Sequence, residues 1–169
     1  MKKIISMLLC CAMLGTLCAC QHGGDYEKRT PVPQFDMMAS YSFDDAALTN
    51  DDGVSYYKQS LGMAKISSKD ERAAQRINAS LAELYVKFNA DAEYTQRVAE
   101  DQPEGETIEL SYYCTPSVTR CDTNALSLVF DISQDIGGVH ADFTRIGRSF
   151  NADTGELLTL ADIAKNEDQ

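Results

Sequence analysis

Histidine is scarce in this chain of 169 residues, which contains only His22 and His140. Transition-metal sites are usually built from several histidine and cysteine ligands. The cysteines do not complete such a set, because four of the six lie within the first 20 residues. Asp131, Asp135, Asp142 and Asp153 surround predicted turns, but the ligand spacing of a calcium-binding EF-hand loop is absent. We therefore predict no metal site and no cofactor.

The sequence also lacks the common motifs that position a nucleophile, a phosphate group or a catalytic zinc ion. Gly-x-Ser-x-Gly, Gly-x-x-x-x-Gly-Lys-[Ser/Thr] and His-Glu-x-x-His are all missing. His140 follows a glycine turn and could act as a base or a ligand, but no nucleophile or second ligand is paired with it in the sequence. A structural role in the turn is the favoured interpretation, so we predict no catalytic residue and no enzymatic activity.

The chain has fewer basic than acidic residues. The chain has 15 Lys and Arg residues against 26 Asp and Glu, which gives a net charge of −11. Such an acidic surface is a poor partner for nucleic acid or for anionic phospholipid. It would attract a cationic partner, although the charge could also serve only to keep the protein in solution.

The N-terminal residues 1–19 have the pattern of a bacterial lipoprotein signal peptide. Lys2 and Lys3 form a positive start, and an apolar run from Ile4 to Leu17 follows. That run is too short to span a membrane comfortably. The sequence Leu17-Cys18-Ala19-Cys20 then resembles a lipobox, which implies that Cys20 carries fatty acids such as palmitate after cleavage. An uncleaved anchor or an ordinary signal peptide is the alternative. We expect a membrane-anchored protein of the bacterial cell envelope that faces the periplasm or the exterior.

Residues 20–34 are predicted to form a tether, and residues 35–169 a single α+β domain. The tether contains turn formers and the stiff segment Thr30-Pro31-Val32-Pro33, without a periodic apolar face. A first strand is expected near 37–43 and a second within 54–66, separated by the turn Asn50-Asp51-Asp52-Gly53. A helix is predicted over 68–89, with Ser68 as N-cap and Glu71 completing a capping box. Residues 89–102 are polar but compatible with a helix, and they either extend this helix or form a separate short one that Pro103 ends. Its apolar residues recur at helical spacing and should pack against a sheet.

Two further segments alternate between apolar and polar residues as strands do. In the first, Ile108, Leu110, Tyr112 and Cys114 share one face; in the second, Leu126, Leu128, Phe130 and Ile132 do so. Pro116 and Ser117 are expected to end the first of these strands. In an oxidising compartment an isolated cysteine pair is most simply a disulfide, so Cys114 and Cys121 are predicted to form a disulfide across the bend between the two strands. A strand over 139–150 is expected to contain a bulge near Arg145 or Gly147, and a second helix should start near residue 159.

Three patterns together resemble one extracellular family. They are Ile77-Asn78 in a long amphipathic helix, the segment Gly-Gly-Val-His-Ala at 137–141, and the run from Phe150 to Ile163 with Asp153-Thr154-Gly155 and Leu158-Thr159-Leu160-Ala161-Asp162. They are similar to the domain of RsiV-like anti-sigma factors, which sense lysozyme, and of PdaC-type peptidoglycan deacetylases, where it precedes the catalytic domain. Val139 stands where the family usually has Ala. The resemblance marks Gly137, Gly138, His140, Asp153 and Gly155 as a structural motif.

The resemblance implies a non-catalytic binding domain whose ligand is a basic envelope protein such as lysozyme, or peptidoglycan. An anti-sigma role is not expected, because only Met1 to Lys3 precede the apolar run. The metal-binding Asp and His set of a deacetylase is also absent. The family continues beyond the last motif, so we expect the chain to be truncated at its C-terminus. The alternative is therefore a regulatory or accessory part of a cell-wall-modifying enzyme whose catalytic part is missing here.

Overall fold

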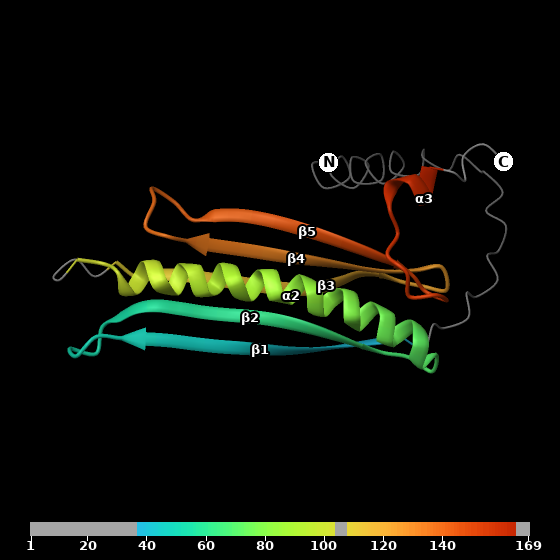
Figure 1. Cartoon of the computed structure of the whole chain (residues 1–169), viewed down its shortest axis with the longest axis horizontal. Helices are drawn as coiled ribbons and strands as arrows, with labels where there is room; N and C mark the ends of the chain where they lie inside the picture. Colours follow the sequence, from blue (N-terminus) through green and yellow to red (C-terminus); the bar gives the residue numbers. More distant parts are fainter. Residues whose placement is uncertain (1–36, 104–107, 165–169) are drawn as a thin grey trace, which may run out of the picture. The chain divides into compact units, whose positions relative to one another are not determined.

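The computed structural model describes residues 37–103 and 108–164, which form a five-stranded sheet with a long helix along one face (Figure 1). The elements, in chain order, are β1 (Met38–Thr49), β2 (Ser55–Ser67), α2 (Glu71–Glu100), β3 (Leu110–Cys121), β4 (Ala125–Asp135), β5 (Asp142–Asn151) and α3 (Leu160–Ala164). The predicted signal peptide, the tether and Cys20 lie outside the described residues.

The strands lie side by side in the order β1-β2-β3-β4-β5. Neighbouring strands are antiparallel except β2 and β3, which are parallel. A parallel pair needs a long crossover connection, and α2 supplies it. The predicted α+β fold, with one long amphipathic helix packed on a sheet and the start of a second helix near the C-terminus, is confirmed. In strand direction, the sheet differs from the expected antiparallel arrangement in this one parallel pair.

Helix α2 extends through the segment after Asn89, which is one of the two alternatives expected, but it begins differently from the prediction. Its N-cap is Asp70, whose carboxylate accepts hydrogen bonds from the backbone N–H groups of Arg72 and Ala73. The predicted cap, Ser68, instead accepts a hydrogen bond from the N–H of Asp70. The polar stretch after Asn89 continues the same helix, because Ala92, Thr95 and Ala99 extend its buried stripe.

The core lies between α2 and the face of the sheet that this helix covers. The alternation predicted for β3 and β4 is confirmed where Leu110, Tyr112 and Cys114, and then Leu126, Leu128 and Phe130, are all buried. It is wrong at Ile108, which precedes β3 and is exposed. The rings of Phe88 and Phe130 meet with centroids 5.4 Å apart. Burial of each large apolar side chain stabilises the fold by roughly 1.5–3 kcal/mol.

Strand β3 does not stop at Pro116. It continues to Cys121, because Pro116 pairs with β4 alone: the ladder between β2 and β3 ends at Leu61 and Cys114. On the side of Pro116 where no strand pairs with β3, the missing N–H of proline removes no hydrogen bond from the sheet. The expected break after Cys114 is therefore wrong.

The expected disulfide between Cys114 and Cys121 is also wrong in this structure, where both are free thiols. They belong to one continuous strand, which places their Cα atoms about 23 Å apart at 3.3 Å per residue. A disulfide requires a Cα separation below roughly 7 Å. Without a bend between them, the two residues have no means of meeting.

The sheet opens between β2 and β3 beyond Leu61, and two side chains of α2 fill the place of a neighbouring strand. The amide of Asn78 bonds the backbone of Ile66 in both directions, accepting from its N–H at 2.8 Å and donating to its C=O at 2.7 Å. The hydroxyl of Tyr85 bonds the N–H and the C=O of Ala64 in the same way. These bonds satisfy backbone groups of β2 that β3 no longer reaches.

Strand β5 contains no bulge, since its register with β4 runs without interruption from Asp142 to Asn151. The expected bulge is wrong. It was inferred from a change in which face of the strand carries apolar residues, but β5 is an edge strand with largely exposed side chains, so its apolar residues need not all lie on one face. Ile146 and Phe150 face the core, and Phe143 lies on the opposite face with 81% of its surface exposed.

Candidate functional site

The residues of the predicted structural motif separate into two groups. Gly137, Gly138 and His140 lie in the connection from β4 to β5, and Asp153 and Gly155 lie in the turn after β5. The ten-residue strand β5 holds these groups roughly 30 Å apart. The motif is therefore not one site, and each group has its own surroundings.

The ring of His140 contacts nearby backbone, as a structural role in the turn predicts, but the residue is exposed and the contact is not buried. Its ring Nδ1 lies 3.1 Å from the carbonyl oxygen of the adjacent Ala141. Strand β5 begins two residues later, at Asp142. Of the two glycines before it, Gly137 alone has a positive φ, of 89°, and its N–H donates to the carboxylate of Asp135 at 2.9 Å. The turn is thus fixed by Gly137 and Asp135.

The second group anchors the turn after β5 to the start of α2. Asn151, which lies outside the predicted motif, organises the turn: its side-chain oxygen accepts hydrogen bonds from the N–H groups of Asp153 and Thr154, each at 2.9 Å. Asp153 itself is exposed. Gly155 has a φ of 71° and lies against Ala73 of α2. This group is structural.

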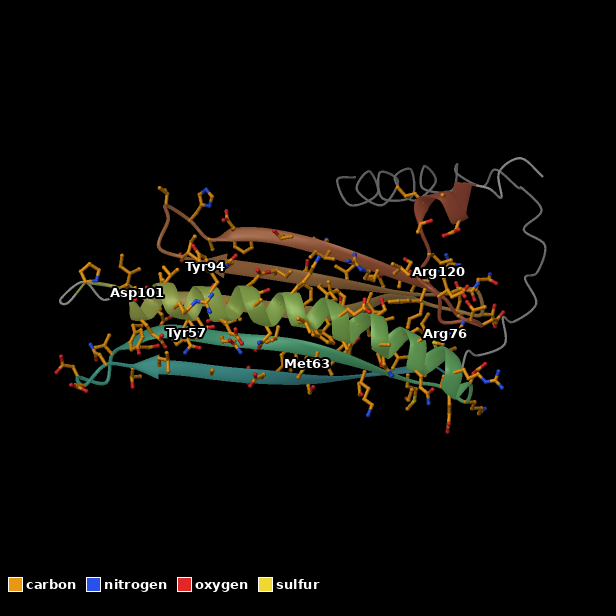
Figure 2. All side chains as sticks on the ribbon, in the orientation of Figure 1. Tyr57, Met63, Arg76, Tyr94, Asp101 and Arg120 are labelled. Atoms are coloured by element: carbon orange, nitrogen blue, oxygen red, sulfur yellow. The ribbon has the colours of Figure 1, made fainter. Side chains whose placement is uncertain are left out.

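The first group belongs to an end of the sheet that carries exposed aliphatic side chains. The turn from β1 to β2, the C-terminal end of α2 with the start of β3, and the connection from β4 to β5 all reach this end (Figure 1). Val139 is fully exposed there, and Ile108 and Ile136 are 54% and 42% exposed. We call this region the loop end; Figure 2 labels Asp101 and Tyr94 close to it. Exposed aliphatic residues that gather in this way typically mark an interaction surface.

A groove of about 180 Å³ lies at the loop end. Its lining residues are mostly apolar: Val98, Gln102, Pro103, Ile108, Leu110, Ile136 and Gly137. Sequence reasoning missed this groove, because Ile108 was expected to share the buried face of β3. The available signal for this end of the sheet was Val139, which replaces the family's Ala and lies in the same connection as Ile136 and Gly137.

A second, larger hollow of about 620 Å³ lies on the sheet face opposite α2. Its lining comes from β3, β4 and β5: Tyr113, Thr115, Asp131, Ile132, Ser133, Phe143, Thr144 and Arg145. Tyr113 and Phe143 both pair with Ser133, so they flank it from either side. Two register pairs further along, on the same face, Arg145 donates to the carboxylate of Asp131 at 2.6 Å. We call this the outer-face groove.

The buried polar groups are held in unreactive forms. Burial raises the pKa of the Cys114 thiol to about 12. Burial likewise raises the pKa of Tyr57 to about 12, with a contribution from Asp44, and the Tyr57 hydroxyl donates to the carbonyl of Ala92 at 3.1 Å. The Cys114 thiol and the Tyr57 hydroxyl therefore stay protonated at neutral pH.

Within residues 37–103 and 108–164, no cluster of three or more His, Cys, Asp or Glu side chains could hold a metal ion. The acids that the sequence placed around turns are dispersed instead. Asp131 pairs with Arg145, Asp135 bonds Gly137, and Asp153 lies beyond the far end of β5. In the same ranges, no helix is both long enough and apolar enough to cross a membrane.

Comparison with known proteins places the fold but not the activity. No family model matches the sequence, and no curated protein matches it. Among solved structures, a DUF3298 family member from Bacteroides fragilis has a TM-score of 0.54 at 12% identity over 76% of this chain. A DUF3298 family protein from Pseudomonas aeruginosa has a TM-score of 0.49 at 12% identity over 79% of this chain.

The present chain spans 61% and 57% of those two proteins. The DUF3298 domain is the one found in RsiV-like and PdaC-like proteins, which agrees with the resemblance drawn from the sequence motifs. At this level of identity the likeness concerns the fold alone, and it is carried by the Bacteroides fragilis structure. The sheet and helix described above are thus similar in fold to a bacterial DUF3298 protein.

Proposed function

We propose that this chain is a lipoprotein of the bacterial cell envelope whose α+β domain binds a basic envelope protein, such as lysozyme, without catalysing a reaction. The observation that carries this proposal is the loop end, where the segments that carry exposed aliphatic side chains also carry the exposed carboxylates of Asp101, Glu109 and Asp142, on a chain of net charge −11. Complementary charge accelerates the encounter with a cationic protein, and the aliphatic side chains then supply contact area. A lipid on Cys20 would hold the domain where such proteins are met.

Peptidoglycan is the second candidate ligand, and the outer-face groove favours it. Two exposed aromatic rings, Tyr113 and Phe143, flank the hydroxyl of Ser133, and the Asp131–Arg145 pair lies beside them. Apolar ring faces combined with a few directed polar groups are the usual composition of a small-molecule or saccharide site. In this form the domain would be an accessory part of a cell-wall-modifying enzyme.

Binding measurements with both ligands test the proposal. The full chain, purified in a nonionic detergent, is titrated with lysozyme at several salt concentrations and is sedimented with peptidoglycan. Binding to lysozyme that weakens as salt rises, without hydrolysis or deacetylation of peptidoglycan, supports the first function. Binding to peptidoglycan that Phe143→Ala abolishes supports the second. Turnover of peptidoglycan that disappears in a folded His140→Ala variant would overturn both, because the domain would then be catalytic.

A further inference from the structure

We propose that the groove at the loop end receives one aliphatic side chain of a cationic protein partner, and that the carboxylates around it contact basic residues on either side of that anchor. This inference rests on the proposed function, since it specifies how a basic envelope protein would be bound. It commits to a polypeptide partner, and not to a small molecule or a second copy of this chain.

The size of the groove points to a single side chain. Its volume of about 180 Å³ is below the roughly 300–1,000 Å³ of pockets that hold drug-sized ligands. The walls are largely aliphatic. Leu110 is buried, Val98 packs against the same buried cluster, and Ile108 and Ile136 are more exposed. A single anchor side chain inserted into a pocket is a common centre of a protein interface, and the aliphatic walls of this groove fit an aliphatic anchor.

Both walls of the groove are fixed before any partner arrives. The side-chain amide of Gln102 bonds Ile108 in both directions, donating to its C=O at 2.8 Å and accepting from its N–H at 2.9 Å. On the other wall, the hydrogen bond from the N–H of Gly137 to Asp135 holds the turn, and a Cβ atom added to Gly137 would lie 3.5 Å from the Leu110 side chain. A receptor that is already ordered loses little conformational entropy on binding.

The charges around the groove select the partner. Asp101 follows α2, Glu109 precedes β3, and Asp135 and Asp142 border the connection from β4 to β5. Asp51 and Asp52 add two more carboxylates in the turn between β1 and β2. The cations on these same segments are Lys58, which is paired with Glu109 at 2.9 Å, and Arg97. An acidic rim of this kind favours lysine and arginine beside the anchor and repels an acidic segment.

Two short peptides test the inference: Lys-Lys-Leu-Lys-Lys and Lys-Lys-Ser-Lys-Lys, each with neutral ends. Isothermal titration of the full chain at low salt should show the leucine peptide binding at least tenfold more tightly than the serine peptide, because burial of one leucine contributes about that factor or more. Ile136→Ser should abolish the difference. The matched control Val86→Ser removes an aliphatic side chain that is 71% exposed in the middle of α2, and it should leave the difference unchanged.

The charge contribution has its own pair of variants. Asp101→Asn, at the loop end, should weaken both peptides by a factor of about two to five, as expected for the loss of one exposed ion pair. Asp153→Asn, in the turn after β5, should not weaken either one. Circular dichroism of each variant checks that the fold is intact.

The outcomes separate this inference from the proposed function. Equal binding of the two peptides, no binding of either, or an unchanged preference in Ile136→Ser would each overturn the groove as a receptor. If lysozyme still binds in those cases, the proposed function stands without the groove. If the leucine peptide binds selectively while lysozyme does not bind, the groove is supported and the proposed partner is wrong.

Discussion

Gly155 lies directly against the backbone of Ala73, in the first turn of α2. A Cβ atom added to Gly155 would lie 2.9 Å from the Cα of Ala73 and closer still to its carbonyl oxygen. Gly155 also has a φ of 71°, a conformation that residues with a Cβ rarely adopt. This contact joins the turn after β5 to the start of the long helix, and Arg76 reinforces it by donating to the carbonyl of Thr154 at 3.2 Å.

Replacing Gly155 by Ala should therefore destabilise the fold through two separable effects. The positive φ costs roughly 1–2 kcal/mol, and the clash with Ala73 adds roughly 1–3 kcal/mol. Gly53→Ala is the matched control, since Gly53 has a φ of 78° but no atom within 4 Å of the added Cβ. Urea unfolding should show the larger loss for Gly155→Ala. Equal losses would mean that Ala73 moves aside without cost.

Asn78→Ala should cost about 2–3 kcal/mol, because it leaves the N–H and the C=O of Ile66 without their hydrogen-bond partner. The control is Asn89→Ala, which removes an exposed bond to Glu93 on the same helix. That change should alter the free energy of unfolding by less than about 0.5 kcal/mol. A similar small effect for Asn78→Ala would show that water replaces the lost bonds.

The two cysteines should differ in reactivity. In the folded protein Cys121 should react with N-ethylmaleimide at pH 8, and Cys114 should react only after unfolding, because it is buried and its pKa is raised to about 12. The pKa of Cys121 is also raised, first by burial and then by Asp122, so its labelling should be slower than that of a free thiol in a peptide. Mass spectrometry of labelled peptides measures both rates. A bonded pair, unreactive until a reductant is added, would contradict the structure.

Asp122 should make the fold acid-sensitive in a defined window. Its hydrogen bond from Arg120, together with bonds from the N–H groups of Ala125 and Asn124, lowers its pKa to about 2. A carboxyl whose pKa is lower in the folded state stabilises the fold above its unfolded pKa, near 3.8, and this contribution is lost as pH falls toward 2. The stability difference between the wild type and Asp122→Asn should thus shrink between pH 4 and pH 2. In Arg120→Gln, nuclear magnetic resonance should show a higher Asp122 pKa.

Lipidation should depend on Cys20. Mass spectrometry of the membrane fraction should find a diacylated or triacylated N-terminal cysteine, and Cys20→Ser should release the protein from that fraction because the acyl chains provide the anchoring. Cys18→Ser is the matched control, since it changes a neighbouring cysteine within the same box. Membrane attachment and processing that persist unchanged in Cys20→Ser would argue for an uncleaved anchor.

Hydrophobic periodicity along the sequence predicted which face of a strand or helix is buried. The alternation of Leu126, Leu128 and Phe130 identified the buried face of β4, and helical spacing placed Ile77, Leu81 and Leu84 in the core. The same reasoning failed at Pro116, because whether a proline breaks a strand depends on how many neighbouring strands it has. The error about the disulfide followed from that one, since it assumed a bend between Cys114 and Cys121.

The loop-end groove could not be predicted, because it is assembled from segments far apart in the sequence. Val98, Ile108 and Ile136 come from a helix end, a strand start and a turn, and no local period connects them. The role of Asn78 was hidden for the same reason. The resemblance singled out Ile77-Asn78, but only the divergence of β2 from β3 explains why an amide is needed there.

The opening between β2 and β3 has a consequence for the cooperativity of unfolding. The amide hydrogens of Ala64 and Ile66 are bonded to side chains of α2, and not to a neighbouring strand. They become available to solvent exchange when the helix lifts from the sheet, even if every strand remains paired. Detachment of the helix therefore exposes these two amides without any opening of the β1–β2 hairpin, and they should exchange deuterium at the rate of helix detachment.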